Sequence, residues 1–273
     1  MIRMRVIVHL SDIHFGRVHL NLVEPLIRSV NQLNPDVVAI SGDLTQRART
    51  YQFKEARAFL DTLPKPQIVV PGNHDVPLHN PFTRFFQPLV KYRRYITDDL
   101  QPFYSDEEIA IVGVNTARSL TFKGGRVNEG QINSVREKLC PLPDEMTKAI
   151  VTHHPFELPE GHGEGDLVGR SRMAMEVLAS CGADLFLAGH LHVSHTGGTA
   201  KRYRIKGHSA LVVSAGTAAS TRGRGEANSF NVLYVQHPQI RVERLHWQPD
   251  AGQFSVAITE RFRHTPDGWV RES

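Results

Sequence analysis

The first half of the chain alternates short apolar runs with longer segments in which apolar residues recur at helical spacing. The apolar runs cover residues 5–10, 36–40 and 67–70, and the segments of helical spacing cover residues 20–33 and 51–63. This order predicts three strands joined by two helices. Because a helix between two strands returns the chain to the edge where it started, the three strands should be parallel.

Residues 80–101 interrupt this alternation. The segment is rich in Phe, Tyr, Arg and Pro, and we expect a helical insertion beside the functional site, acting either as a lid or as a contact with a partner subunit. The alternation then resumes. Strands and helices are predicted in turn at residues 109–115, 129–139, 149–152, 171–180 and 185–188.

After residue 192 the pattern contains strands without helices between them. Apolar and β-branched runs occupy residues 210–214, 230–236, 240–247 and 254–262, and turn residues separate them. We expect these strands to form a second sheet. Residues 264–273 contain Pro, Asp, Gly and charged residues, and are predicted to form a loose tail.

The composition is that of an ordinary globular protein. The 273 residues are 40% hydrophobic and 22% charged, which predicts a single domain over residues 1–263. Because the sequence has no run of about 18 apolar residues and no signal-peptide pattern, we expect no membrane span and a cytoplasmic location. Cys140 and Cys181 lie outside any C-x-x-C pair, and we expect them to be reduced thiols at helix ends.

Five short motifs place metal-ligand side chains after predicted strands. They are Asp12-Ile13-His14, Gly42-Asp43, Gly72-Asn73-His74-Asp75, Thr152-His153-His154-Pro155 and Gly189-His190-Leu191-His192. The motifs offer imidazole, carboxylate and amide groups without a thiolate, a set that suits hard or borderline divalent cations. Since open α/β sheets bind ligands at the carboxyl ends of their strands, the loops that carry Asp12, Asp43 and Asn73 should meet in one crevice. The sequence predicts a two-metal hydrolytic site there.

The ordered motifs D-x-H, G-D, G-N-H-D, H-x-P and G-H-x-H resemble those of the calcineurin-like metallophosphoesterase superfamily over residues 12–192. The resemblance implies an α/β fold of four layers, in which two mixed β-sheets lie face to face with helices outside. It also implies a dinuclear metal centre at the edge of the sheets.

The resemblance assigns roles to individual residues. One metal would be held by Asp12, His14, Asp43 and His192, and the other by Asp43, Asn73, His153 and His190. A hydroxide bridging the metals would attack phosphorus in line. His74 would be the catalytic histidine that is not a ligand, and Asp75 would orient its imidazole and raise its pKa.

Four further residues are candidates for contact with the substrate. His154 adjoins a predicted ligand and is either a supporting or a substrate-facing group, whereas Arg170, Arg172 and Arg222 lie in polar loops. A guanidinium suits phosphate oxygens, but the alternative for each arginine taken singly is a solvated basic loop. The formal net charge of +4 fits anionic small substrates and, with less support, nucleic acid.

The motifs differ from those of other branches of this superfamily, and the differences narrow the expected activity. His14 and Gln46 stand where purple acid phosphatases carry glycine and tyrosine, and the motifs look most like bacterial class III cyclic-nucleotide phosphodiesterases and their glycerophosphodiesterase relatives. We expect a phosphodiesterase with two divalent metal ions, Mn, Fe or Zn, that hydrolyses a small diester such as a cyclic nucleotide. The alternatives are a phosphomonoesterase, a nuclease, and a binding module without catalysis. The sequence leaves open whether the protein forms a homodimer.

Overall fold

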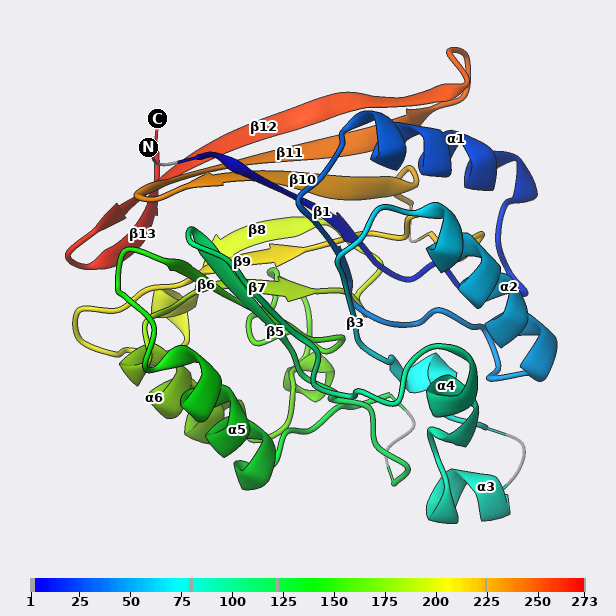
Figure 1. Cartoon of the computed structure of the whole chain (residues 1–273), viewed down its shortest axis with the longest axis horizontal. Coiled ribbons are helices and arrows are strands. Elements are labelled where there is room, and N and C mark those ends of the chain that lie inside the picture. The colour runs from blue at the N-terminus through cyan, green and yellow to red at the C-terminus, as the bar shows by residue number, and fades with distance from the viewer. Residues whose placement is uncertain (1–2, 79–80, 121–122, 224, 273) are drawn as a thin grey trace.

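Two mixed β-sheets lie face to face, with helices on their outer surfaces, in the computed structural model of the chain (Figure 1). The structure describes residues 3–78, 81–120, 123–223 and 225–272. Three apolar clusters fill the three interfaces between these layers: one between the sheets, and one between each sheet and its helices. The expected four-layer α/β sandwich is confirmed.

The first sheet has seven strands in the order β13-β12-β11-β10-β1-β2-β3. The parallel strands β1, β2 and β3 form one side of it, as predicted, and β10 pairs with β1 in the antiparallel direction. The strands are β1 Arg5–Leu10, β2 Val37–Ile40, β3 Gln67–Val69, β10 Ser229–Gln236, β11 Gln239–Gln248, β12 Gln253–Thr265 and β13 Gly268–Arg271.

The second sheet has six strands in the order β4-β5-β6-β7-β9-β8. Strands β5, β6, β7 and β9 are parallel, while β4 and β8 pair antiparallel at the two edges. These strands are β4 Phe103–Ser105, β5 Ile109–Gly113, β6 Thr147–Val151, β7 Ala183–Ala188, β8 His195–Gly198 and β9 Leu211–Ser214.

The C-terminal strands do not form a sheet of their own, so that prediction is wrong. Strands β10 to β13 extend the sheet that begins with β1, and β9 instead joins β7 in the other sheet. The predicted loose tail is also wrong over residues 264–265, which end β12, and over residues 268–271, which form β13 against β12. Trp269 is buried there, and its Nε1 donates to Asp184 Oδ1 at 2.8 Å.

Six α-helices are present in the described part of the chain. Helices α1 and α2 cover the first sheet, and α5 and α6 cover the second (Figure 1). Their bounds are α1 Leu20–Gln32, α2 Thr50–Thr62, α3 Pro81–Phe86, α4 Val90–Tyr95, α5 Glu129–Leu139 and α6 Ser171–Ser180. Among the described residues, no helix has the length and apolar character needed to cross a membrane.

The predicted insertion at residues 80–101 contains the two short helices α3 and α4, although Asn80 lies outside the described residues. Tyr92 of α4 is fully buried, and its hydroxyl donates to the Val69 carbonyl oxygen at the end of β3. In contrast, α3 exposes Phe82 and Phe86 by 70% and 72%. The insertion is helical as expected, and its role as a lid or an interface stays a prediction.

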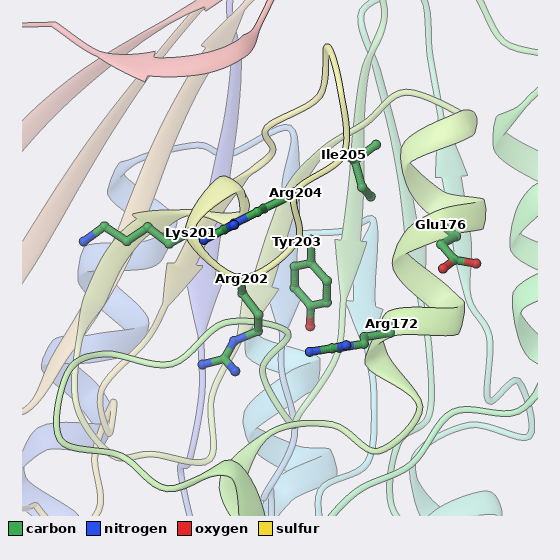
Figure 2. Close-up of a pocket in the computed structure, with 7 residues that line it drawn as sticks. All are labelled: Arg172, Glu176, Lys201, Arg202, Tyr203, Arg204 and Ile205. Carbon is green, nitrogen blue, oxygen red and sulfur yellow. The ribbon is translucent and has the colours of Figure 1, made fainter.

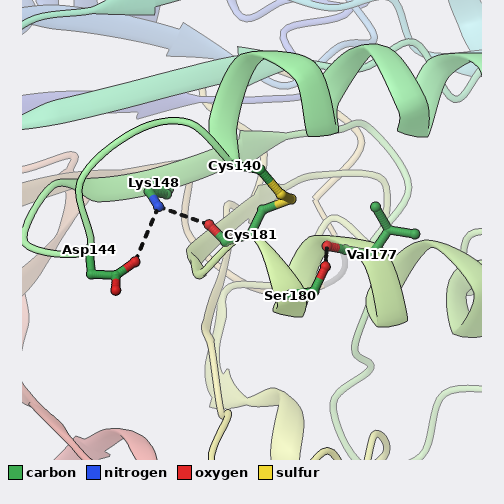
Figure 3. The surroundings of a disulfide bond; sticks show 6 residues. All are labelled: Cys140, Asp144, Lys148, Val177, Ser180 and Cys181. Carbon is green, nitrogen blue, oxygen red and sulfur yellow. Dashed lines mark hydrogen bonds and ion pairs between the residues drawn. A yellow bond between two sulfur atoms is a disulfide. The ribbon is translucent and has the colours of Figure 1, made fainter.

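The two cysteines form a disulfide, which corrects the expectation of free thiols (Figure 3). Cys140 directly follows α5 and Cys181 directly follows α6, so their predicted position at helix ends is confirmed. The bond joins two neighbouring helices across 41 residues of sequence. Nothing in the local sequence of either cysteine distinguishes this pair from two free thiols packed side by side.

Candidate metal centre

The five ligand motifs meet at one edge of the sandwich, as the strand pattern predicts. Asp12, Asp43 and Asn73 lie in the loops after β1, β2 and β3, while His153 and His190 follow β6 and β7. The first three strands belong to one sheet and the last two to the other. The centre therefore lies where the carboxyl ends of parallel strands from both sheets come together.

Five of the predicted ligands have left-handed backbone conformations. The φ angles of Asp12, His14, Asp43, His190 and His192 lie between 52° and 73°. Residues other than glycine rarely adopt this region, and such strain concentrates at functional sites, where the surrounding fold maintains it. The motif glycines allow the loops to pack closely, since a Cβ on Gly72 would overlap the Asp43 carboxylate.

The first group of ligand atoms comes from Asp12, His14, Asp43 and His192, which are all buried. These atoms lie within 4.8 Å of one another. His14 Nε2 is 3.6 Å from Asp12 Oδ1 and 3.6 Å from Asp43 Oδ2, and His192 Nε2 is 3.3 Å from Asp12 Oδ1. Among the described residues, Asp12 Oδ1 has no hydrogen-bond donor although it is buried. A cation among these atoms would satisfy that oxygen.

The second group comes from Asp43, Asn73, His153 and His190. Asn73 Oδ1 lies 3.0 Å from His153 Nε2 and 3.2 Å from His190 Nδ1. His153 Nε2 is also 3.4 Å from Asp43 Oδ2, the same oxygen that faces His14. The Asp43 carboxylate thus lies between the two groups, in the position that a bridging ligand needs.

Backbone carbonyl groups fix the orientation of two of these imidazole rings. His153 Nδ1 donates to the Ser41 carbonyl oxygen at 2.8 Å, and His192 Nδ1 donates to the Arg222 carbonyl oxygen at 3.1 Å. Both Nε2 atoms are left facing the carboxylates. Metal-binding histidines are commonly held this way. Together with the nitrogen and oxygen donor set, this arrangement fits divalent cations such as Mn, Fe or Zn.

Two hydrogen bonds hold the Asp12 carboxylate in place. The His190 backbone N–H donates to Asp12 Oδ2 at 2.9 Å, and the Ser11 hydroxyl donates to the same oxygen at 2.6 Å. Neither Ser11 nor Ser41 was singled out from the sequence. Their position directly before Asp12 and Gly42 in the first two motifs is the signal that would have found them.

Asp43 and His153 stabilise each other's charged forms. Burial opposes ionisation of Asp43, but the neighbouring His153 overrides this effect and holds the Asp43 pKa well below its usual range. Burial likewise acts against a charged His153, yet the Asp43 carboxylate raises the pKa of that imidazole to about 9. The carboxylate therefore requires positive charge beside it, which a bound cation would supply in place of the proton.

Asp75 does not orient the His74 imidazole, so this expectation is wrong. The Asp75 carboxylate accepts hydrogen bonds from the backbone N–H groups of Leu44, Thr45 and Gly72, and thus ties two ligand loops together. His74 Nδ1 donates instead to the Gln46 carbonyl oxygen at 2.9 Å. The expected rise of its pKa is also wrong, since burial lowers the pKa of His74.

Arg222, one of the predicted substrate-binding residues, lies beside His74. Its Nη1 donates to His74 Nε2 at 2.7 Å. Both residues line a cavity of about 280 Å³, together with Gln46, Arg47 and Lys123. Asn73 also lines this cavity, which connects the second ligand group with a cationic surface. Val76 and Leu78 provide its apolar part.

His154 is fully buried, which rules against the substrate-facing alternative. Its Nε2 donates to the Lys123 carbonyl oxygen at 2.8 Å, and its Nδ1 contacts the Thr116 hydroxyl at 2.8 Å. With both ring nitrogens engaged, His154 supports the centre by packing its ring against His190 at 4.5 Å between centroids. Burial lowers its pKa far below the usual value, so the ring is neutral.

The structure does not bring the other two arginines to this cavity. Arg170 and Arg172 lie at the start of α6, and they line two different cavities that contain neither His74 nor Asn73. Their predicted contact with the substrate receives no support from this placement.

The fold and the site define a metal-dependent hydrolase of the two-sheet sandwich class. The chain belongs to the calcineurin-like phosphoesterases, whose family model matches residues 5–194. This family consists of hydrolases that act on phosphoesters, and the resemblance inferred from the motifs is confirmed.

Two curated relatives share 26% identity with the chain. One is glycerophosphodiester phosphodiesterase GpdQ from Enterobacter lignolyticus, with the match covering 59% of this chain and 60% of that protein. The other is a probable GpdQ from Arcobacter nitrofigilis, with coverage of 68% and 71%. The match thus spans less than two thirds of the first relative.

Solved structures with low identity share the fold. The purple acid phosphatase PPD1 from yellow lupin seeds has a TM-score of 0.66 at 13% identity, covering 95% of this chain and 54% of that chain. A dimetal phosphatase from Danio rerio has a TM-score of 0.63 at 15% identity, with coverage of 88% and 95%. At these identities the likeness concerns the fold alone.

Proposed function

We propose that the protein is a phosphodiesterase that hydrolyses a small phosphodiester at a dinuclear metal centre. One observation carries this proposal. A single oxygen, Asp43 Oδ2, faces His14 of one ligand group and His153 of the other, next to a cavity lined by His74 and Arg222. Two bound cations would supply charge neutralisation at the phosphate and a nucleophile derived from water at neutral pH.

The chain's own residues would bind and orient the phosphate. Arg222 carries a guanidinium that now donates to His74 Nε2, and phosphate oxygens are the better acceptors for that group. When Arg222 turns to a phosphate, His74 Nε2 is freed toward the leaving oxygen. An anionic diester beside this nitrogen favours a protonated imidazole, which opposes the effect of burial and suits proton transfer to the leaving group.

The size of the cavity favours a small substrate. Its volume of about 280 Å³ is at the lower end of ligand pockets, which hold roughly 300–1,000 Å³. Arg47, Lys123 and Arg222 would neutralise a phosphate, and Val76 and Leu78 would contact an apolar part. Cyclic nucleotides remain the expected class. The named activity of the two curated relatives adds glycerophosphodiesters as candidates.

The alternatives are a phosphomonoesterase and a nuclease that use the same centre. The first test compares hydrolysis of bis(p-nitrophenyl) phosphate and p-nitrophenyl phosphate by manganese-loaded protein, with Asn73→Ala as the control. We expect preference for the diester and loss of activity in the variant. Preference for the monoester would overturn the proposal in favour of a phosphatase.

A second panel then identifies the substrate. It contains cAMP, 2′,3′-cyclic nucleotides, glycerophosphoethanolamine and single-stranded DNA. Hydrolysis of a cyclic nucleotide or of the glycerol diester would support a small substrate, whereas activity confined to DNA would establish the nuclease. Inactivity of the metal-loaded protein toward every compound would favour the binding module.

A further inference from the structure

A second cavity, apart from the catalytic one, is lined mainly by cationic side chains. Its volume is about 490 Å³, and it lies between the start of α6 and residues 201–205. Figure 2 shows its cationic residues, Arg172, Lys201, Arg202 and Arg204, with Tyr203 and Ile205 beside them. Among the described residues that line this first cavity, Glu176 is the one acid.

A further cavity adjoins the first and extends its cationic surface. This space of about 360 Å³ shares Arg172, Arg202 and Tyr203 with the first cavity and adds one cation, Arg170, and one acid, Glu164, which pairs with Arg202. The two spaces therefore form one concave surface, which we call the basic cavity. Its cations come from the start of α6 and from residues 201–204, two segments that are brought together only in the folded chain.

Most of these cations lack a balancing carboxylate. Arg202 forms ion pairs with Glu157 and Glu164. No ion pair within the described part of the chain involves Arg170, Arg172, Lys201 or Arg204. In Figure 2 the Arg172 side chain extends toward Tyr203, and the Glu176 carboxylate lies away from it. The basic cavity thus carries a clear excess of positive charge.

The floor of the basic cavity is fixed by buried contacts. Tyr203 is only 5% exposed, and its hydroxyl donates to the Phe156 carbonyl oxygen at 2.7 Å. Arg202 Nε donates to Glu157 Oε1 at 3.0 Å, and that glutamate is itself buried. These contacts hold Arg202 and Tyr203 in place without a ligand. A preorganised surface lowers the entropy lost when an anion binds.

We propose that the basic cavity binds a ligand that carries at least two phosphate groups, at a site separate from the catalytic centre. Four cationic groups without carboxylate partners exceed the charge of one phosphate, and the volume exceeds what one phosphate would fill. Guanidinium groups match the geometry of phosphate oxygens. This inference goes beyond the proposed function and does not depend on it.

The experiment measures binding of inorganic pyrophosphate to chelator-treated protein by titration calorimetry. Removing metals abolishes their contribution at the catalytic centre, so a failure of the proposed function would leave this readout intact. The test variant is Arg172→Gln/Arg204→Gln. The matched control is Arg28→Gln/Lys54→Gln, which removes the same charge from exposed positions on α1 and α2.

We expect the test variant to bind pyrophosphate about tenfold or more weakly, because each substitution removes a charged hydrogen-bond donor to a phosphate oxygen. The control should bind like the unaltered protein, and orthophosphate should bind more weakly than pyrophosphate. Both variants should keep the melting temperature and the diesterase activity of the parent. Equal affinity of the test and control variants would overturn the site, and equal affinity for the two anions would overturn the requirement for two phosphates.

Discussion

The parallel strands of the second sheet have their carboxyl ends on one side of the sheet and their amino ends on the other. We call these two sides the carboxyl edge and the amino edge, and they serve different purposes. At the carboxyl edge, β6 and β7 lead into His153 and His190, whose neighbours include the buried carboxylates of Asp12 and Asp43. At the amino edge, the same strands begin near the Cys140–Cys181 disulfide, and Lys148 Nζ donates to the Cys181 carbonyl oxygen at 2.9 Å (Figure 3). The carboxyl edge holds the metal ligands and their left-handed backbone, whereas the amino edge carries the disulfide.

This contrast indicates how the fold maintains its candidate site. Charges buried close together destabilise a protein unless they are compensated, and left-handed backbone at several ligands adds strain. The disulfide joins the ends of α5 and α6 shortly before β6 and β7 begin, so it can stabilise the sheet without touching the ligands. Changes at the carboxyl edge should therefore remove function, and changes at the amino edge should remove stability.

The largest expected effect is that of Asp43→Asn on catalysis. The substitution removes the carboxylate that both ligand groups share. We expect activity to fall by more than the roughly 10- to 100-fold that loss of an outer metal contact produces. Metal content, measured by elemental analysis, should fall with it. Thermal unfolding of the metal-free variant checks the fold, and a variant that retains both metals would contradict the bridging role.

The next effect is that of His74→Ala on turnover. Loss of a group that transfers a proton lowers the rate by about 10²- to 10⁴-fold. Because the His74 imidazole points to Gln46 and Arg222, metal content should stay unchanged. Steady-state kinetics with elemental analysis separates the two effects. Equal turnover in the variant and the parent would remove His74 from the reaction.

Asp75→Asn provides the comparison for His74→Ala. Its carboxylate holds the ligand loops through Leu44, Thr45 and Gly72, whereas the ring nitrogens of His74 contact Gln46 and Arg222. We therefore expect Asp75→Asn to lower thermal stability as well as activity. A loss of turnover with unchanged stability would restore the orienting role predicted from the sequence.

The ligands could be predicted from the sequence because each motif is local and follows a predicted strand. The shared location of Asp12, Asp43 and Asn73 could be predicted from the rule that parallel strands end at one edge of a sheet. The role of Asp75 could not be predicted, because its partners Leu44 and Thr45 precede it by about thirty residues and belong to another loop.

Long-range pairing explains the other differences from the prediction. The sequence of β10 indicates a strand, but nothing in it specifies pairing with β1, more than 200 positions earlier. Cys140 and Cys181 likewise meet only because α5 and α6 pack side by side. Arg172 and Arg204 line one cavity because the start of α6 and residues 201–205 lie side by side in the folded chain.

Removing the disulfide tests the amino edge. We expect Cys140→Ala/Cys181→Ala to lower the free energy of unfolding by about 2–4 kcal/mol, the usual range for a disulfide. Activity at a temperature below unfolding should stay unchanged. Denaturant titration and the diesterase assay measure the two quantities. A loss of activity without a loss of stability would contradict the division between the edges.

The redox state of the pair also bears on the predicted cytoplasmic location. Disulfides persist in oxidising compartments and are uncommon in the cytosol. Mass spectrometry of protein alkylated at the moment of cell lysis would show whether the two thiols are free. The structure leads us to expect the bonded form in purified protein.

The smallest expected effect concerns Asp184, beside the disulfide end of the sheet. Burial raises the pKa of its carboxyl, although the Lys148 backbone N–H and the Trp269 indole donate hydrogen bonds to it. The folded chain therefore binds this proton more tightly than the unfolded chain does. The resulting stability is fully present below the unfolded pKa and is lost as pH rises through the folded pKa.

Asp184→Asn removes this titration but also replaces one hydrogen-bond acceptor by a donor, which lowers stability by an amount independent of pH. We therefore expect the variant to lose less stability relative to the parent at pH 7 than at pH 4. Melting temperatures of both proteins across that range measure the difference. A constant gap between the two curves would show that Asp184 keeps an ordinary pKa. Asp184 would then add no pH dependence to stability at the amino edge, in contrast with Asp43 at the carboxyl edge, whose pKa lies well below its usual range.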